Sequence, residues 1–312
     1  MDIEALHPVG ARVTGTSLPD LALDALGALL AEHGVVVLPG QDDADDEDFL
    51  AFLRALGPLA FTTGETPLES HPDLNVISNV GRDTPPRSSF HVDTSYVAAP
   101  PAYTALRAVT VPARGGATQF SNQYRAYETL PEALRTRLAG RSIRHVVTGL
   151  SPDDAGTETE AWHPVFRPHP RTGRTALYLS TAARCAEVSG MDAEESAATV
   201  RELIGHSTRP DNVLDHRWSP GDVVVWDNAC VLHRADHSGV VGGPGHAPRH
   251  GARARRAPRR PLSSRRTPDA VAAPAAEGAR TTSGVRRRDP PAAGSRISGR
   301  SRVRRWCGRR RV

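Results

Sequence analysis

Residues 219–234 read SPGDVVVWDNACVLHR, and this stretch contains two candidate β-strands that decide the fold class. DVVVWD (222–227) is a short apolar run that begins in the turn signal SPGD, and NACVLHR (228–234) follows it directly. Short apolar runs bounded by Gly, Pro and Asp are typical of strands, whereas helices need longer periodic segments. The stretch therefore predicts two neighbouring strands in a β-rich domain.

The same pattern extends towards the N-terminus. Turn signals such as ARGG (113–116) and PRTGR (170–174) separate candidate strands at 104–111, 118–122, 142–148 and 175–180, and earlier candidates are 35–39 and 74–78. Predicted helices cover 20–33, which Gly34 ends, then 46–56, a segment from Pro131, and 193–205 with Asp192 as its cap. Many short strands with a few helices predict a mainly β fold, a double-sheet sandwich or jelly roll with helical decoration.

The C-terminal part of the chain has a different composition. Residues 243–312 contain 20 arginines and only three acidic residues, about +17, so residues 1–242 carry about −13 of the net +4. The segment has one Leu, one Trp and no Phe or Tyr, too little apolar surface to offset the entropy of ordering. We therefore predict a folded domain over 1–242 and a disordered Arg/Pro/Ala/Gly-rich tail over 243–312.

The cysteines and the N-terminal segment exclude several classes. Cys185, Cys230 and Cys307 are too few and too scattered for a disulfide framework or a zinc motif. The N-terminus lacks a basic segment followed by an apolar run, and no stretch has about 18 apolar residues. We expect a cytoplasmic protein without a membrane partner.

FHVDTSY (90–96) is the segment with the clearest chemical content. In an extended strand, His91 and Asp93 point to the same face, as two of the three ligands of a two-histidine, one-carboxylate iron(II) site would. The spacing alone is weak, because His71 and Asp73 have it too, and either pair could be a surface turn or a simple polar pair.

Three longer segments set His91 and Asp93 in context. AAPPAYTALRAVTVPARGGATQFSNQYRAYETLP follows the pair, and HPVFRPHPRTGRTALYLS and STRPDNVLDHRWSPGDVVVWDNACVLHRADHS come later. In this order they resemble the TauD/TfdA family of iron(II)- and 2-oxoglutarate-dependent dioxygenases, over roughly residues 5–242. The resemblance implies a double-stranded β-helix, the cupin-like jelly roll.

The resemblance also implies roles for individual residues. His91 and Asp93 match the first two iron ligands, His233 matches the third, and Thr118 matches the threonine that contacts the far carboxylate of 2-oxoglutarate. Phe90 and Ala117 depart from the usual Trp and Asp without touching the metal. The implied cofactors are Fe(II), 2-oxoglutarate and O2, and the implied reaction hydroxylates a C–H bond of a small, acidic organic substrate while 2-oxoglutarate becomes succinate.

Other polar and aromatic residues have simpler interpretations. His163 and His169 lie beside prolines at a turn and need no ligand, and Asp227 and Asn228 are expected to cap a turn. Phe61 and Tyr96 are candidates for a substrate pocket or for the core. FTTGETP (61–67) lacks the histidine that taurine-oxidising relatives place there, which disfavours taurine. The sequence does not indicate an oligomeric state.

One element of the family pattern is missing. About eleven residues after the distal histidine the family has an arginine that pairs with the far carboxylate of 2-oxoglutarate, and a second basic residue often follows four positions later. Here both positions, 244 and 248, are proline. GC-rich codons for GPGHAPRHG (243–251), read from the second nucleotide, spell Asp-Arg-Val-Met-His-Arg-Gly-Met, with arginines at both positions.

This alternative reading leads to two hypotheses. In the first, residues from about 243 onward are an out-of-frame translation, so the domain lacks its final strand and its arginine, activity is impaired, and no nucleic-acid partner is expected. In the second, the tail is a genuine basic arm on a catalytically inactive jelly roll and binds nucleic acid or another partner.

Overall fold

The computed structural model divides the chain into two compact units, Met1–Arg260 and Pro261–Val312. It describes residues 1–60, 67–75, 89–149, 158–238, 240 and 251–254, all of which belong to the first unit. The predicted segments that lie wholly or partly outside these ranges are Phe61, part of the strand 74–78, and the tail predicted over 243–312, positions 244 and 248 included.

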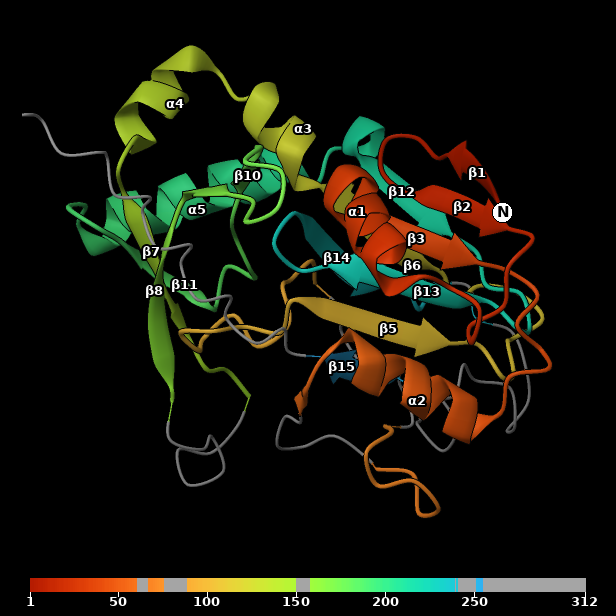
Figure 1. Ribbon diagram of the computed structural model, residues 1–312. Helices are drawn as coiled ribbons and strands as arrows, with labels where there is room; N and C mark the ends of the chain where they lie inside the picture. The colour runs from red at the N-terminus through yellow and green to blue at the C-terminus, as the bar shows by residue number, and fades with distance from the viewer. Residues whose placement is uncertain (61–66, 76–88, 150–157, 239, 241–250, 255–312) are drawn as a thin grey trace, which may run out of the picture. The chain divides into compact units, whose positions relative to one another are not determined.

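A large mixed sheet forms one layer of the domain (Figure 1). Its strands, in spatial order, are β1 (Asp2–Ala5), β2 (Ala11–Thr14), β3 (Val35–Leu38), β13 (Val223–Asp227), β5 (Tyr103–Arg107), β15 (Gly251–Ala254) and β4 (Leu59–Ala60). β13, the first strand of the opening stretch, is central and pairs antiparallel with β3 and β5. All five of its residues are buried, as its continuous apolar run requires.

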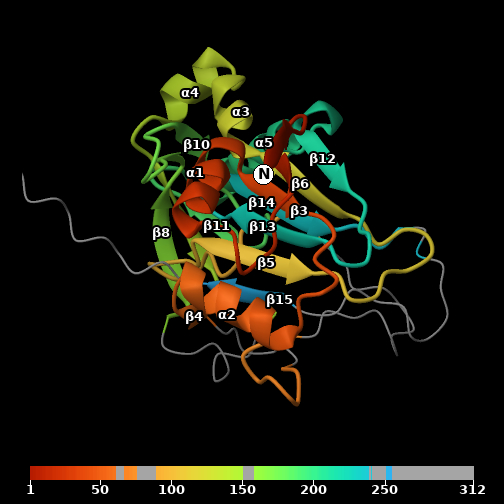
Figure 2. The same ribbon diagram turned by 45° about the vertical axis from the view of Figure 1, so that its right-hand side comes forward.

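Two helices cover one face of this sheet. They are α1 (Leu23–His33) and α2 (Asp46–Leu56), and Figures 1 and 2 show both against the strands. Val36 and Val225, on alternate positions of β3 and β13, pack into the same apolar cluster as Leu26 and Phe49 of the helices. This cluster anchors the sheet from its outer side.

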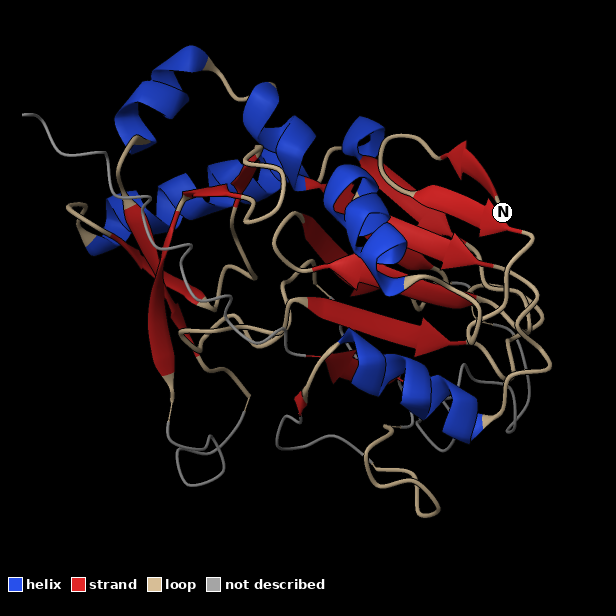
Figure 3. Cartoon of the chain, in the orientation of Figure 1, coloured by secondary structure: helices blue, strands red, loops and turns tan. Residues whose placement is uncertain are grey.

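The other face of the large sheet packs on a second, smaller sheet. Its strands are β12 (Val213–His216), β6 (Thr118–Asn122) and β14 (Val231–Ala235), in that order. Val37 and Trp226 of the large sheet share a buried cluster with Phe120 and Val231 of the small one. Two sheets with side chains interdigitating between them confirm the predicted jelly-roll core, and Figure 3 shows the predominance of strands.

The remaining elements form an extension beside the two sheets. They are the sheet β11 (Cys185–Val188), β7 (Ser142–Val146) and β8 (Glu160–Pro164), the hairpin β9 (Phe166–Pro168) and β10 (Thr175–Leu177), the helices α3 (Gln123–Glu128), α4 (Glu132–Leu138) and α5 (Ala193–Ser207), and the 3-10 turn η1 (Pro210–Asn212). Their apolar side chains form a separate core cluster. No helix among the described residues is long and apolar enough to cross a membrane.

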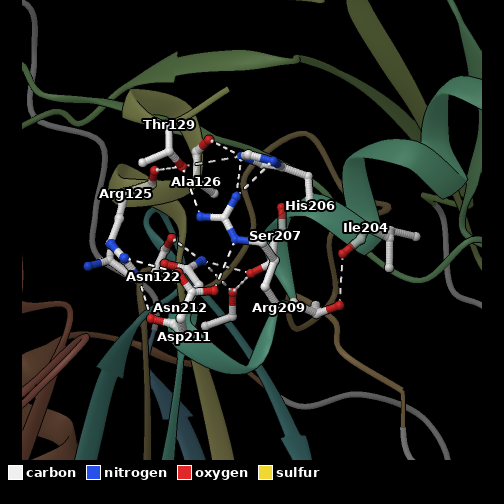
Figure 4. Close-up of polar contacts among 12 residues, drawn as sticks. Asn122, Arg125, Ala126, Thr129, Ile204, His206, Ser207, Arg209, Asp211 and Asn212 are labelled. Atoms are coloured by element: carbon white, nitrogen blue, oxygen red, sulfur yellow. Dashed lines mark hydrogen bonds and ion pairs between the residues drawn. The ribbon is translucent and has the colours of Figure 1, made fainter. Parts of the chain in front are cut away.

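A polar cluster fastens the end of α5 to α3 (Figure 4). His206 donates from Nε2 to the carbonyl of Ala126 at 2.9 Å, so its Nδ1 is free to accept from Arg209 at 3.0 Å. Arg209 also donates to Asp211 at 3.1 Å, and Asp211 accepts a second bond from Arg125 at 3.1 Å. These contacts hold η1 in place, and β12 begins directly after it beside β6.

Helix ends follow the predicted signals, whereas several short elements, among them α3 and β15, were not predicted. Gly34 ends α1 with φ 77°, and the Asp192 carboxylate accepts from the backbone N–H of Glu195 at the start of α5. The short helix α3 was missed, because its six residues are too few for a periodic signal. β15 lies beyond the boundary predicted at residue 242, where we expected no final strand. β15 pairs with β5 and β4 through backbone hydrogen bonds, and Gly251–Ala254 contains no proline that would remove a backbone N–H donor.

Candidate metal centre

His91 and His233 pair directly across neighbouring strand segments. The backbone N–H of each residue donates to the carbonyl oxygen of the other at 3.0 Å, and their ring centroids lie 4.3 Å apart. Asp93 reaches the same point: its Oδ1 is 3.6 Å from His91 Nε2, and its Oδ2 is 3.8 Å from His233 Nε2. The ligand atoms of the three residues all lie within 4.8 Å of one another, the spacing of a site that one metal ion can fill.

A hydrogen bond fixes the orientation of the His91 imidazole. Its Nδ1 lies 2.8 Å from the carbonyl oxygen of Ser89. A carbonyl only accepts, so Nδ1 carries the proton and Nε2 keeps the lone pair that faces Asp93. His233 and Asp93 are buried, whereas the His91 side chain is 28% exposed, so the site is open on the His91 side.

Thr104 holds the Asp93 carboxylate, and Asn228 in turn holds Thr104. The hydroxyl of Thr104, on β5, donates to Asp93 Oδ2 at 2.7 Å, and the side-chain amide of Asn228 donates to the same hydroxyl oxygen at 2.9 Å. An ionised carboxylate can only accept, so the Thr104 proton is directed to Asp93 and its oxygen is free for Asn228. Asn228 is thus a partner of Thr104, not the turn cap that the sequence predicts, whereas Asp227 does cap its turn by accepting from the N–H of Ala229 at 2.8 Å.

The chain turns sharply after Asp93. Thr94 has φ 49°, a left-handed conformation that is rare for a β-branched residue and is found where surrounding contacts enforce it. Ser95 supplies such contacts: its hydroxyl lies 3.0 Å from His145 Nδ1, and its carbonyl accepts from His163 Nε2 at 2.9 Å. His163 therefore does have a structural partner, which the sequence did not indicate.

Both histidines that hold Ser95 are kept neutral. Burial, and then the neighbouring His163, Arg184 and Arg167, lower the pKa of His145 to about 3. Burial, followed by Arg167, also lowers the pKa of His163. Two neutral imidazoles with fixed hydrogen bonds thus support the turn that follows His91 and Asp93.

Thr118 lies on the same face of the small sheet as the distal histidine. Phe120 pairs with His233 and Thr118 pairs with Ala235 across β6 and β14, and residues two apart in a strand share a face. The Thr118 hydroxyl is buried and accepts a hydrogen bond from Trp218 Nε1 at 3.0 Å. The structure therefore brings all four predicted site residues to one side of the small sheet.

A second buried group, His169, Asp227 and Cys230, also has metal-ligand spacing, but its atoms are already engaged. His169 Nδ1 accepts from the backbone N–H groups of Arg171 and Thr172 at 3.2 and 3.3 Å, so Nε2 carries the proton and donates to Asp227 at 3.0 Å. Burial, and then Asp227, raise the pKa of the Cys230 thiol well above its usual value. A protonated thiol and an imidazole without a free lone pair make this a packing cluster.

The other candidates from the sequence lie elsewhere. His71 Nε2 is 3.4 Å from Glu47, and Asp73 accepts from Arg54 at 2.7 Å, so both residues of the second His-x-Asp pair contact other side chains at the surface. Tyr96 is buried, with the Arg184 guanidinium 5.4 Å from its ring centroid, and is therefore enclosed in the protein interior.

Known proteins with similar sequences are dioxygenases. Residues 2–255 match the model of the taurine catabolism dioxygenase TauD, TfdA family. The chain is 31% identical over 262 residues to the (S)-phenoxypropionate/alpha-ketoglutarate-dioxygenase of Delftia acidovorans, covering 73% of this chain and 86% of that enzyme. It is 32% identical over 262 residues to an alpha-ketoglutarate-dependent sulfate ester dioxygenase of Pseudomonas putida, covering 74% and 83%.

The fold is also similar to solved structures. The crystal structure of a taurine dioxygenase from Burkholderia xenovorans superposes with a TM-score of 0.69 at 27% identity, covering 81% of this chain and 90% of that one. The similarity therefore extends over most of both chains.

Proposed function

The chain belongs to the TauD, TfdA family of dioxygenases, and from this premise we propose that it hydroxylates an unactivated C–H bond of a small organic acid. As a member it is a 2-oxoglutarate-dependent non-haem iron enzyme whose cofactors are Fe(II), 2-oxoglutarate and O2. In the proposed reaction, 2-oxoglutarate loses carbon dioxide and becomes succinate while one oxygen atom enters the substrate.

The convergence of His91, Asp93 and His233 carries the proposal. Two imidazoles and one carboxylate are the donor set that iron(II) takes when positions must stay open for other ligands. Iron(II) with 2-oxoglutarate supplies the activation of dioxygen. The chain's own residues hold two of the three donors in place: Ser89 fixes the His91 ring, and Thr104 fixes the Asp93 carboxylate.

We assign Thr118 to the far carboxylate of 2-oxoglutarate. Its hydroxyl is buried on the sheet face that also carries His233. Thr118 lies on β6 two residues before Phe120, the residue that pairs with His233 on β14. A hydroxyl that donates to a carboxylate makes a charge-assisted hydrogen bond, stronger than one between neutral groups. A dicarboxylate that reaches the metal with one end can thus meet Thr118 with the other.

The acidic nature of the substrate rests on the relatives. One is named for phenoxypropionate and another for a sulfate ester, and both compounds are small anions. We expect the protein in the cytoplasm, without a membrane or nucleic-acid partner, and cell fractionation tests the location.

Product formation tests the function directly. The purified protein, supplied with iron(II) and 2-oxoglutarate in air, is offered a panel of aryloxy acids, alkyl sulfates and sulfonates, and succinate and hydroxylated product are quantified by mass spectrometry. We expect one class to give product and succinate in equal amounts. Asp93→Ala abolishes both, while Asp73→Ala, the same change in the surface His-x-Asp pair, leaves them unchanged. Succinate that no substrate increases would contradict the assignment.

We also propose that residues 243–312 come from out-of-frame translation. The missing arginines at 244 and 248 and the reversal of charge support this origin. The nucleotides of codons 240–251 test it. The idea requires that a single-base shift there encodes Arg-x-Met-His-Arg, and it is wrong if no such shift does.

A further inference from the structure

The hydrogen bond between Trp218 and Thr118 has a fixed direction. Trp218 Nε1 lies 3.0 Å from Thr118 Oγ1, and an indole N–H can only donate. The Thr118 oxygen is therefore the acceptor, and its own proton must point elsewhere. Within the part of the chain that the structure describes, Thr118 makes no further side-chain hydrogen bond, although it is only 6% exposed. The buried Thr118 hydroxyl can therefore still donate its own proton to a ligand.

Thr118 and the metal centre lie on the same face of the small sheet, one row of residues apart. Thr118 is paired with His216 on one side and Ala235 on the other, and the next row on the same face is Leu214, Phe120 and His233. Diagonal neighbours in adjacent strands lie about 7–8 Å apart. This is a distance that a five-carbon dicarboxylate spans.

Trp218 is itself held by the turn that connects β12 to β13. Its ring meets the His216 ring edge to face, with centroids 4.7 Å apart. His216 Nε2 lies 3.4 Å from Asp222, whose carboxylate accepts from the backbone N–H of Ser219 at 2.9 Å. The contacts of His216 and Asp222 therefore restrict the position of the Trp218 indole, and its N–H has a defined direction.

We propose that Trp218 is a positioning residue that fixes the Thr118 rotamer, so that the hydroxyl donates to the far carboxylate of 2-oxoglutarate. This inference rests on the proposed role of Thr118. Without the indole N–H, the hydroxyl can rotate and must be reordered whenever the cosubstrate binds. Trp218 makes no contact with the cosubstrate in this scheme and acts through Thr118 alone.

A double-mutant cycle tests the inference through binding, without turnover. The full chain and the variants Trp218→Phe, Thr118→Val and the double variant are titrated with 2-oxoglutarate under anaerobic conditions, with iron(II) present, following the charge-transfer absorbance of the complex. We expect Thr118→Val to weaken binding at least about tenfold and Trp218→Phe about three- to tenfold. In the Thr118→Val background, Trp218→Phe has no further effect, because its action passes through the hydroxyl. Thr118→Ser, which keeps a hydroxyl, recovers most of the affinity.

Three controls separate positioning from general damage. Binding of 2-oxopentanoate, which has a methyl group in place of the far carboxylate, is unchanged in Trp218→Phe, as is iron(II) affinity. Trp162→Phe, which changes an exposed tryptophan on β8, behaves as wild type. Equal losses for both oxo acids, no loss at all, or additive effects in the double variant would overturn the inference. A wild-type chain that does not bind 2-oxoglutarate would contradict the proposed function as well.

Discussion

Thr104 lies near the start of β5, where its hydroxyl joins Asn228 to the Asp93 carboxylate. Thr104→Val keeps the shape of the side chain but leaves Asp93 without this donor. Hydrogen-bond partners of metal ligands typically contribute 10–100-fold to metal affinity, so we expect a loss of about that size. Competition titration with a chelating dye measures it. Thr104→Ser retains the hydroxyl and serves as control, and a valine variant with unchanged affinity would show that Asp93 needs no support.

His145 gives the folded state a defined pH dependence. Its pKa is about 3 in the folded protein and 6.5 in the unfolded chain, so below pH 6.5 the unfolded state takes up a proton that the folded state does not. The free energy of unfolding therefore decreases as the pH falls, for this group by about 1 kcal/mol between pH 6.5 and 5.5 and by about 1.4 kcal/mol per unit below that, down to about pH 3.

His145→Asn removes this titration and can still bond to Ser95. Urea denaturation at pH 6.5, 5.5 and 4.5 measures the difference. We expect the stability of the variant to fall less steeply than that of the wild type over this range. Identical slopes would mean that His145 is protonated in the folded protein.

The site residues differ in how far the sequence alone reveals them. His91 and Asp93 show a local His-x-Asp spacing, but His71 and Asp73 share it, so only the longer family pattern distinguishes the two pairs. His233 is distant in sequence and meets them through one backbone bridge, so only the family pattern indicated it. Thr104 and Asn228 belong to no spacing rule, because their contact depends on the pairing of β5 with β13.

At the scale of elements, β15 is the segment whose contribution is easiest to isolate. A chain that ends at Arg260 keeps this strand between β5 and β4, whereas a chain that ends at Gly242 loses it and leaves both edges unpaired. We expect the longer chain to melt like the full protein. The shorter one should lose about 2 kcal/mol or more in backbone hydrogen bonds, which lowers Tm by at least about 4 °C. Equal melting temperatures for the two truncated chains would show that β15 adds no stability.

The sequence predicts the elements that have an apolar pattern and misses those that have none. α1, α2 and α5 have periodic apolar faces and strong end signals, and β13 has a continuous apolar run with a turn before it. α3 is too short to show a period. β15 has no apolar pattern at all, and it occupies its position through backbone pairing, which composition does not encode.

At the scale of the whole molecule, the charge distribution and the missing arginine both support a change of reading frame after residue 242. If the reading frame is restored after residue 242, the tail loses its excess of arginine and an arginine returns at position 244. A bidentate arginine–carboxylate pair contributes about 1.5–3 kcal/mol, so we expect the frame-corrected chain to bind 2-oxoglutarate at least about tenfold more tightly in the anaerobic iron(II) titration.

Two further proteins decide whether the arginine causes that gain. Replacing the restored arginine at 244 by leucine in the frame-corrected chain should return the affinity to that of the present chain. Pro244→Arg in the present chain should recover only part of it, because the flanking residues remain out of frame. If the frame-corrected chain binds no better, the clamp is dispensable here and the basic segment must be explained as a genuine arm. In that case salt-sensitive DNA binding should disappear when residues 243–312 are removed.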